Sequence, residues 1–416
     1  MRVLFLTVYF PPEAGPPQAR NYETAKRLVE WGHDVTILTA FPNHPTGVIA
    51  PGYRGKLFMR ETMDGLNVVR TWLYPAPNRG LWRWAAKHLS FSASSLLAAP
   101  LAGKFDVVLV GSASLFLGLT AYAIGRLRNV PWVLTISDLW PATAVAQRRL
   151  SQPGLIKLAE NLATFVYTRA DIAIAVTQGV REELVRLGVP QDRIAYIPNG
   201  TDTALFRPDA DGEATRKAWG LEGKFVLMYA GNMGPTQGLD VILDTAKLLH
   251  DEPDVQFVLV GEGADKRHLA DRARLEGINN VSFFPQQPYE RMPSILNAAN
   301  AIVVTQRSGR FFHGVVPSKA AEVMACGRPA IMAIAGEAAG MLERAGAGIA
   351  VEPESPQALA DAVLKVKQEP ELAAKMGRSG REFAVRELDR TVLARRLEAL
   401  LLDVLSGGGG LRVRAS

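Results

Sequence analysis

Short apolar runs alternate with longer segments of helical periodicity along the first half of the chain. Runs of aliphatic and β-branched residues between helices are typical of buried strands in a parallel sheet that is covered on both faces. The predicted strands are residues 3–8, 34–38, 68–72, 107–110, 132–136 and 172–176, and helices are predicted over 19–31 and 115–128. The pattern therefore predicts an α/β domain of the doubly wound, Rossmann-like type.

The same alternation begins again after a polar, breaker-rich segment at 203–223. Further strands are predicted at 225–229, 256–260, 281–284, 301–304, 329–334 and 348–351. We expect two Rossmann-like domains that face each other across a cleft, an N-terminal domain over 1–205 and a C-terminal domain over 206–385. A long amphipathic helix is predicted over 388–405, and we expect 386–405 to pack back on the first domain. The glycine-rich end, 406–416, is predicted to be a flexible tail.

Composition is ordinary for a globular protein with sizeable cores. The chain has 416 residues, of which 48% are hydrophobic and 21% are charged. Cys326 is the only cysteine, which excludes disulfides within the chain and fits a reducing compartment. The six histidines form no HExxH motif and no Cys/His cluster, so no structural zinc site is expected.

Charge is distributed unevenly, since the net charge of +6 comes from the first 150 residues. These hold 16 Lys and Arg against 8 Asp and Glu, whereas the rest of the chain is close to neutral. A basic half can attract an anionic membrane surface, a pyrophosphate-bearing substrate or nucleic acid, or it can be an arginine-rich surface without a partner. No nucleic-acid-binding motif accompanies the charge, so we expect no nucleic-acid partner.

Two apolar segments bear on membrane association. The run at 3–10 follows Arg2, but Pro11, Pro12 and Glu13 come next without a small-residue cleavage site, so it is predicted to be a buried strand. The stretch 89–103 is too short to span a bilayer. It follows Trp82, Trp84 and three basic residues, Arg79, Arg83 and Lys87. Either an interfacial membrane helix or a buried amphipathic helix fits this pattern.

The segment 313–329 carries the most specific chemistry. It follows a predicted strand and opens a helix near Pro317 and Ser318, where free N–H groups and a partial positive charge suit a phosphate. Glu322 lies one turn further on, where its carboxylate can hold the two hydroxyls of a ribose. The alternative is an ordinary helix start in which Glu322 only favours the helix dipole.

Three other loops follow predicted strands. In 230–240, glycines allow close backbone approach, and Asn232 and Gln237 can donate to phosphate oxygens, although a plain strand-to-helix loop also fits. The shorter turn at Gly261 is better explained as structural. The loop at 9–20 has one glycine, Gly15, where a dinucleotide fingerprint needs GxGxxG, so a dehydrogenase is poorly supported. Asp138 ends another strand, where it can orient a hydroxyl group or cap a helix.

Read together, these segments resemble family 4 of the retaining glycosyltransferases, which have the GT-B fold. The resemblance spans nearly the whole chain, and the order of its motifs is specific although no single motif is. Its elements are Pro11-Pro-Glu-x-x-Gly15, the turn at 31–35, Pro198-Asn-Gly-Thr-Asp202, Gly261-Glu-Gly263, Asn280-Val281 and 322–329. The segments 41–47, 52–54 and 316–319 look most like the subgroup of L-fucosamine transferase-like enzymes.

The resemblance implies that the C-terminal domain binds a nucleotide-diphosphate sugar and that the N-terminal domain binds the acceptor. Glu322 matches the family's ribose-binding glutamate, whereas Gly314 replaces the glutamate that contacts the donor sugar. Asn232 and Gln237 stand where the family has an arginine and a lysine for the diphosphate, and Ser137 stands where it has a histidine. We predict that Lys319 or Arg307, rather than Asn232 and Gln237, supplies the missing cation, with Arg310 as a further basic residue nearby.

These inferences combine into one predicted function, transfer of a sugar from a UDP- or other NDP-sugar to a glycan on a polyprenyl pyrophosphate. The sugar implied is a hexose or an N-acetylated deoxyhexosamine, the pathway is O-antigen, capsule or exopolysaccharide synthesis, and the place is the cytoplasmic membrane surface. Retention without a protein nucleophile or a metal is implied by the family. Two alternatives remain, a nucleotide-sugar 2-epimerase and a non-catalytic nucleotide-sugar-binding protein.

The predicted site residues fall into three sets. The catalytic set is Asp138, Lys319 and Glu322. The nucleotide-sugar set is Gly231, Asn232, Gln237, Gly261, Arg307, Gly314, Val315, Val316, Ser318, Lys319 and Glu322. The acceptor side comprises Glu13, Gly15 and Asp138.

Overall fold

The computed structural model describes residues 1–13, 15–44, 46–76, 80–111, 114–146, 150–309 and 313–407. The chain divides into two units, Met1–Pro198 with Leu393–Ser416, and Asn199–Val392. Of the tail expected at 406–416, residues 408–416 lie outside the described part, as do Arg79 and Arg310.

The first unit contains an eight-stranded sheet in the order β3-β4-β2-β1-β5-β6-β7-β8. Its strands are β1 (Arg2–Leu6), β2 (Asp34–Ala40), β3 (Phe58–Met63), β4 (Leu66–Thr71), β5 (Val107–Val110), β6 (Trp132–Ile136), β7 (Ile172–Ala175) and β8 (Ile194–Tyr196). The predicted strands are present, with ends displaced by no more than one or two residues. All neighbours are parallel except β3 and β4, so the expectation of a purely parallel sheet is wrong at this edge.

The unpredicted edge strand has a local cause. Asp64 and Gly65 both have positive φ, 49° and 80°, and they form the two-residue turn that connects β3 to β4. An Asp-Gly pair is favoured in such hairpin turns. Because β3 lies at the sheet edge and none of its side chains is fully buried, its sequence lacks the apolar run that marks the other strands.

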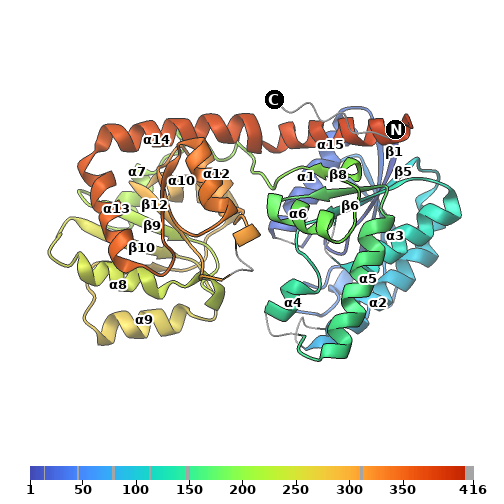
Figure 1. The fold of residues 1–416 in the computed structure, drawn as a ribbon, viewed down its shortest axis with the longest axis horizontal. Helices are drawn as coiled ribbons and strands as arrows, with labels where there is room; N and C mark the ends of the chain where they lie inside the picture. The colour runs from blue at the N-terminus through green and yellow to red at the C-terminus, as the bar shows by residue number, and fades with distance from the viewer. Residues whose placement is uncertain are drawn as a thin grey trace. The chain divides into compact units, whose positions relative to one another are not determined.

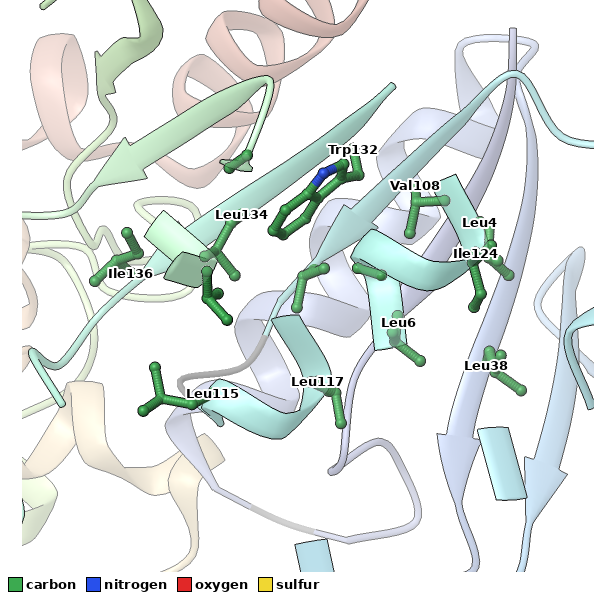
Figure 2. Close-up of a cluster of buried hydrophobic side chains, with 14 of the residues drawn as sticks. Leu4, Leu6, Leu38, Val108, Leu115, Leu117, Ile124, Trp132, Leu134 and Ile136 are labelled. Carbon is green, nitrogen blue, oxygen red and sulfur yellow. The ribbon is translucent and has the colours of Figure 1, made fainter. Parts of the chain in front are cut away.

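Helices cover both faces of the first sheet. These are α1 (Pro16–Glu30), α2 (Leu81–Ala98), α3 (Leu115–Arg128), α4 (Ala142–Ala146), α5 (Pro153–Arg169) and α6 (Gln178–Arg186). Alternate residues of the strands pack on α3 on one face, as Figure 2 shows for Leu4, Val108 and Ile124. On the other face, α1 and the last helix, α15 (Arg390–Leu405), share a core with β1. Leu397, Leu400 and Leu401 of α15 are buried there.

The segment that suggested a membrane contact is helix α2, and it is amphipathic. Phe91 and Ala98 are fully buried, whereas Trp82, Leu89 and Leu97 are at least half exposed. Lys87 is only 1% exposed, so of the two alternatives the buried amphipathic helix describes its position. A buried ammonium group cannot reach lipid headgroups, because the surrounding protein screens it from them.

The second unit has a six-stranded parallel sheet in the order β11-β10-β9-β12-β13-β14. Its strands β10, β9 and β12 are labelled in Figure 1. The strands are β9 (Phe225–Ala230), β10 (Val255–Val260), β11 (Val281–Phe284), β12 (Ala301–Thr305), β13 (Ala330–Ala333) and β14 (Gly348–Val351). The helices are α7 (Glu213–Ala218), α8 (Asp240–Leu248), α9 (Lys266–Leu275), α10 (Met292–Asn297), α11 (Lys319–Ala325), α12 (Glu337–Ala345), α13 (Pro356–Gln368) and α14 (Pro370–Phe383). This is the doubly wound strand order, with the reversal between β9 and β12.

The chain leaves and re-enters the first unit through two segments that pair with each other. Thr201 and Asp389 form an isolated parallel bridge, and the Thr203 hydroxyl donates to the Asp389 carboxylate at 2.6 Å. These bonds hold the residues that flank both crossings to the second unit. The second unit spans residues 199–392, so it begins seven residues earlier and ends seven residues later than the predicted 206–385.

Candidate active site

The reversal of strand order in the second sheet brings two loops together. The loop after β9 begins at Gly231, and the described residues between β12 and α11 are 306–309 and 313–318. In open α/β sheets, ligands bind at the carboxyl ends of the strands where the order reverses. Most of the predicted nucleotide-sugar residues lie on these two loops and on the helix that follows the second one.

Glycines allow the loop after β9 to pack closely on its neighbour. A Cβ atom on Gly261, whose φ is +147°, would lie 1.9 Å from the carbonyl oxygen of Gly231. A Cβ atom on Gly263 would lie 2.2 Å from the carbonyl oxygen of Met233. Only glycine permits such an approach. Gly261 therefore supports the Gly231 loop through its backbone.

Lys319, the first residue of α11, places its ammonium group against the β9 loop. Its Nζ donates to the Tyr229 hydroxyl at 2.9 Å and to Gln237 Oε1 at 3.3 Å. It also lies 4.1 Å from the centroid of the Tyr229 ring, within cation–π distance. Burial lowers the pKa of Lys319 to about 7, partly offset by Glu322. An anion bound here would favour the charged form and raise that pKa.

Tyr229, the penultimate residue of β9, connects Lys319 to the loop that follows the strand. Its hydroxyl group donates to the carbonyl oxygen of Asn232 at 2.6 Å while it accepts from Lys319. Gln237 offers its amide oxygen to Lys319 and its amide nitrogen to Thr236. The structure thus brings Gly231, Asn232, Gln237 and Lys319 together.

Glu322 lies one turn after Lys319 on the same face of α11. It is partly buried, and burial raises the pKa of its carboxyl group to about 7. Arg390, Lys319 and a hydrogen bond from Tyr289 act in the opposite direction. The Glu322 carboxyl group thus has one hydrogen-bond donor, Tyr289, and two positively charged neighbours, Arg390 and Lys319. A carboxylate accepts hydrogen bonds, so hydroxyl groups are suitable partners for it.

Arg307 is placed differently from Lys319. Its Nε donates to the carbonyl oxygen of Pro235 at 2.6 Å, and its Nη1 lies 3.5 Å from Glu354 Oε1. Its backbone N–H donates to the carbonyl oxygen of Thr236 at 3.0 Å. Arg307 thus donates to the backbone of the loop after β9, whereas the ammonium group of Lys319 lies next to Gly231.

The turn ahead of α11 comprises Gly314, Val315 and Val316, followed by Pro317 and Ser318. Val316 packs against a hydrophobic core of the second unit that includes buried residues of β12 and α11. Ser318 is the exposed N-cap residue of α11, and its side chain makes no hydrogen bond to the helix. A Cβ atom on Gly336 would lie 2.2 Å from the carbonyl oxygen of His313, so a glycine there is needed for the turn to pack. Since α11 has only seven residues, its dipole is short.

The predicted acceptor-side residues lie in the first unit. Asp138 follows β6, keeps part of its surface exposed, and has a carboxyl pKa raised by burial and lowered by Arg20. Arg20 donates to the Ser137 hydroxyl at 3.2 Å. Gly15 precedes α1, where a Cβ atom would lie 2.6 Å from Gln18 Oε1. Glu13 is buried and accepts from two backbone N–H groups of the loop after β2.

Comparisons with known proteins decide the family. The model for glycosyl transferases group 1 matches residues 211–383, and the model for the glycosyl transferase 4-like domain matches 16–200. The putative colanic acid biosynthesis glycosyl transferase WcaI of Escherichia coli is 30% identical over 404 residues, which cover 94% of this chain and 97% of the relative. The chain is a family 4 glycosyltransferase with the GT-B fold.

Two further proteins resemble this glycosyltransferase. The probable glycosyltransferase WbjE of Pseudomonas aeruginosa is 27% identical over 288 residues, 68% of this chain and 71% of the relative. The Anabaena protein HepE, solved in complex with UDP, has a TM-score of 0.74 at 18% identity and covers 97% of this chain and 100% of its own. The second likeness confirms the fold of two Rossmann-like domains.

Three residues of the glycosyltransferase's candidate site escaped the sequence analysis. Tyr229 carries a polar group at the carboxyl end of an apolar strand, a signal that could have been read. Tyr289 and Arg390 face Glu322 from segments 33 residues before it and 68 residues after it, and no motif marks either. Among the described residues, no group of three or more His, Cys, Asp or Glu side chains is arranged to hold a metal ion.

Proposed function

We propose that this glycosyltransferase moves a sugar from a UDP- or other NDP-sugar to a lipid-linked glycan during the synthesis of a surface polysaccharide. WcaI, named for colanic acid biosynthesis, supports the pathway class. The neighbour solved with UDP supports the donor class. The resemblance to the L-fucosamine transferase-like subgroup favours an N-acetylated deoxyhexosamine as the sugar and retention as the stereochemical course.

One observation carries the donor half of the proposal, the position of the Lys319 ammonium group. It lies against Tyr229, Gln237 and Gly231 at the reversal of strand order, one helical turn from Glu322. When the bond between sugar and diphosphate breaks, negative charge develops on the β-phosphate. A lysine held in a water-poor environment stabilises that charge more strongly than one in bulk water.

The other residues take complementary roles in the proposed reaction. Glu322 accepts hydrogen bonds from the ribose hydroxyls, and Tyr289 and Arg390 keep its carboxylate in place. The N–H groups of 315–318 contribute further donors toward the diphosphate. In a retaining transfer by front-face attack, the leaving phosphate takes the acceptor proton, so Asp138 is assigned an orienting role and no protein nucleophile is required.

The donor half is tested by UDP binding, measured calorimetrically. Lys319→Met should weaken UDP binding by about ten- to a hundredfold, the loss expected for a hydrogen bond to a charged group. Lys247→Met serves as the matched control, because Lys247 is a half-exposed lysine of α8 that forms an ion pair with Glu276. Equal UDP affinity in the two variants would contradict the assignment of Lys319.

The reaction is tested with a panel of UDP- and GDP-sugars, incubated with and without membrane lipid. A transferase consumes donor only when the lipid acceptor is present and attaches the sugar to it. Conversion of the donor without any acceptor would indicate an epimerase. Binding of UDP without consumption of any donor would indicate a nucleotide-sugar-binding protein.

Membrane association at the inner face belongs to the same proposal, because a lipid-linked acceptor resides in the bilayer. The exposed side of α2 supports it, since Trp82 is 74% exposed beside Arg83 and Leu97 is 73% exposed. Tryptophan and arginine are favoured at a membrane interface. Within the described residues, every helix is either too short or too polar to cross a bilayer.

A further inference from the structure

Glu354 lies in the short segment between β14 and α13, and its backbone has an unusual conformation. Its φ is +58°, in the left-handed region that residues other than glycine seldom adopt. Pro353 precedes it, and a proline followed by a residue of positive φ is typical of a turn in which glycine or asparagine is usual at the second position. Strained residues of this kind cluster at functional sites, so the contacts of the Glu354 side chain are informative.

The Glu354 carboxylate contacts three donor groups of the loop after β12. Its Oε2 atom accepts from the backbone N–H of Ser308 at 3.0 Å and from the Ser308 hydroxyl at 2.5 Å. Its Oε1 atom lies 3.5 Å from Nη1 of Arg307. The hydrogen bonds from Ser308 lower the pKa of Glu354 below its usual value, and the charge of Arg307 adds to their effect. The carboxylate is therefore charged at neutral pH and holds two successive residues of this loop.

Glu354 itself stands on a rigid support. The next residue, Ser355, is the N-cap of α13, and its hydroxyl accepts from a backbone N–H of the first turn. Helix α13 packs on α8 through fully buried residues that include Leu359 and Val363. The position of the carboxylate is therefore set by the core of the second unit and does not depend on the loop that it contacts.

The residues held by Glu354 also hold the loop after β9. Arg307 donates from Nε and from its backbone N–H to the carbonyl oxygens of residues 235 and 236, at 2.6 Å and 3.0 Å. Gln237, the next residue of that loop, places its Oε1 atom 3.3 Å from Nζ of Lys319. A continuous series of polar contacts thus runs from Glu354 through Arg307 to the loop that contacts Lys319.

The contact is poorly suited to a role in stability alone. The side chains of Arg307 and Glu354 are 48% and 39% exposed, and exposed ion pairs contribute little to the free energy of unfolding. The positive φ of Glu354 acts against even that contribution. A glycine would form the turn with less strain but would remove the acceptor of Ser308. The glutamate therefore adds a fixed position for the loop after β12.

From these contacts we infer that Glu354 is a positioning residue for the diphosphate of the donor, and that it acts by holding the loop after β12 against the loop after β9. The inference rests on the proposed transferase function and adds to its donor half a residue from outside the two loops. Glu354 touches no substrate in this role. It keeps Gln237 in place, and Gln237 in turn keeps the ammonium group of Lys319 where the β-phosphate is stabilised.

UDP affinity of full-length variants tests the inference, measured calorimetrically with thermal unfolding recorded in parallel. Glu354→Gly removes the carboxylate and fits the backbone, so it should weaken UDP binding about three- to tenfold with little change in the unfolding temperature. Glu354→Gln keeps an acceptor oxygen for Ser308 and should bind UDP nearly as tightly as the unmodified protein. If Glu354 acted only through its charge, Glu354→Gln would bind UDP more tightly, and that result would overturn the inference.

Asp64→Gly is the matched control. Asp64 is another acidic residue of positive φ, 49°, and its carboxylate accepts a hydrogen bond from the Tyr22 hydroxyl in the first unit. The control variant removes the same kind of strain and the same kind of contact, and it should leave UDP affinity unchanged. Equal UDP affinities in Glu354→Gly and Asp64→Gly would overturn the inference.

A double-variant cycle tests the route through Lys319. In the Lys319→Met background the ammonium group is absent, so Glu354→Gly should cost little further affinity. Ser308→Ala should reproduce part of the loss in the unmodified background and add nothing to Glu354→Gly. An equal loss from Glu354→Gly with and without Lys319 would contradict the route and overturn the inference.

Amide hydrogen exchange separates this inference from the proposed function, because it needs no nucleotide. The backbone N–H groups of Arg307, Ser308 and Gln237 should exchange faster in Glu354→Gly than in Asp64→Gly, since each is bonded within the two loops. Unchanged exchange would overturn the inference and leave the transferase assignment standing. If exchange responded as expected but the unmodified protein bound no UDP, the proposed function would fail and the coupling of the two loops through Glu354 would stand.

Discussion

Nucleotide affinity should depend on pH through Lys319. Burial lowers the pKa of its ammonium group from 10.5 to about 7, so about half of the free enzyme carries the charge at neutral pH. A bound diphosphate favours the protonated form, and the pKa of Lys319 in the complex must then exceed its value in the free protein. Proton uptake is therefore coupled to binding, and the affinity for UDP should fall as the pH rises above 7.

The size of the effect follows from the fraction protonated. Between pH 7.5 and 8.5, a group of pKa about 7 loses most of its remaining protons. If the charge of Lys319 contributes the ten- to hundredfold in affinity expected from Lys319→Met, the UDP affinity should fall about three- to sevenfold over this range, below the limit of about 1.36 kcal/mol per pH unit. Titration calorimetry at both pH values, in buffers of different ionisation enthalpy, measures the affinity and the proton uptake together.

Variants assign the slope to its source. Lys319→Met should bind UDP weakly and show no such fall, and Lys247→Met should retain it. Glu322→Gln removes the neighbouring group that also titrates near pH 7, and it should keep the downward slope. A flat affinity profile in the unmodified protein, or an equal slope in Lys319→Met, would refute the placement of Lys319 against the diphosphate.

Three further predictions concern stability, reactivity and lipid contact. Because burial raises the pKa of Glu322 from 4.5 to about 7, the folded state holds a proton that the unfolded state releases between these values, and stability should decline as the pH rises through this window. Glu322→Gln should therefore raise the free energy of unfolding at pH 7 by about 1–3 kcal/mol, with little change at pH 4.5. Urea titrations of both proteins measure this, and an equal increase in the free energy of unfolding at the two pH values would refute it. Cys326 is fully buried with its thiol pKa raised to about 12, so a thiol reagent at pH 8 should label it only in denaturant, and rapid labelling of the native protein would contradict that burial. The double variant Trp82→Ser with Arg83→Glu should weaken sedimentation with anionic liposomes, most at low salt, while Lys87→Met should not, and the opposite order would contradict the burial of Lys87.

Much of the fold could be predicted, because fully buried parallel strands carry continuous apolar runs. The strands at 107–110 and 281–284 begin and end where the sequence placed them. The edge strand β3 could not be recognised in this way, since an edge position tolerates polar residues and leaves alternation only weakly expressed. The Asp64-Gly65 turn was the available signal.

The candidate site was predictable only in its local part. Lys319 and Glu322 share one helix, so their spacing places them on one face. Tyr289 and Arg390 reach Glu322 from remote segments, and only the tertiary structure brings them there. For Lys87 the local sequence pattern was misleading, because the side chain is buried. Its basic neighbours suggested a surface role, but a lysine can be buried when a carboxylate such as Glu13 lies close enough to support its charge.

The return of the chain at Leu393 decides how the two halves can be separated. Leu397, Leu400 and Leu401 complete a core that the first 198 residues begin, so one cut after Pro198 yields an N-terminal fragment with an open apolar face. That fragment needs the last helix restored, either joined through a short artificial linker or added as a synthetic peptide. The intervening part, 199–392, carries no share of that face, so it can be excised as a single piece for nucleotide titrations.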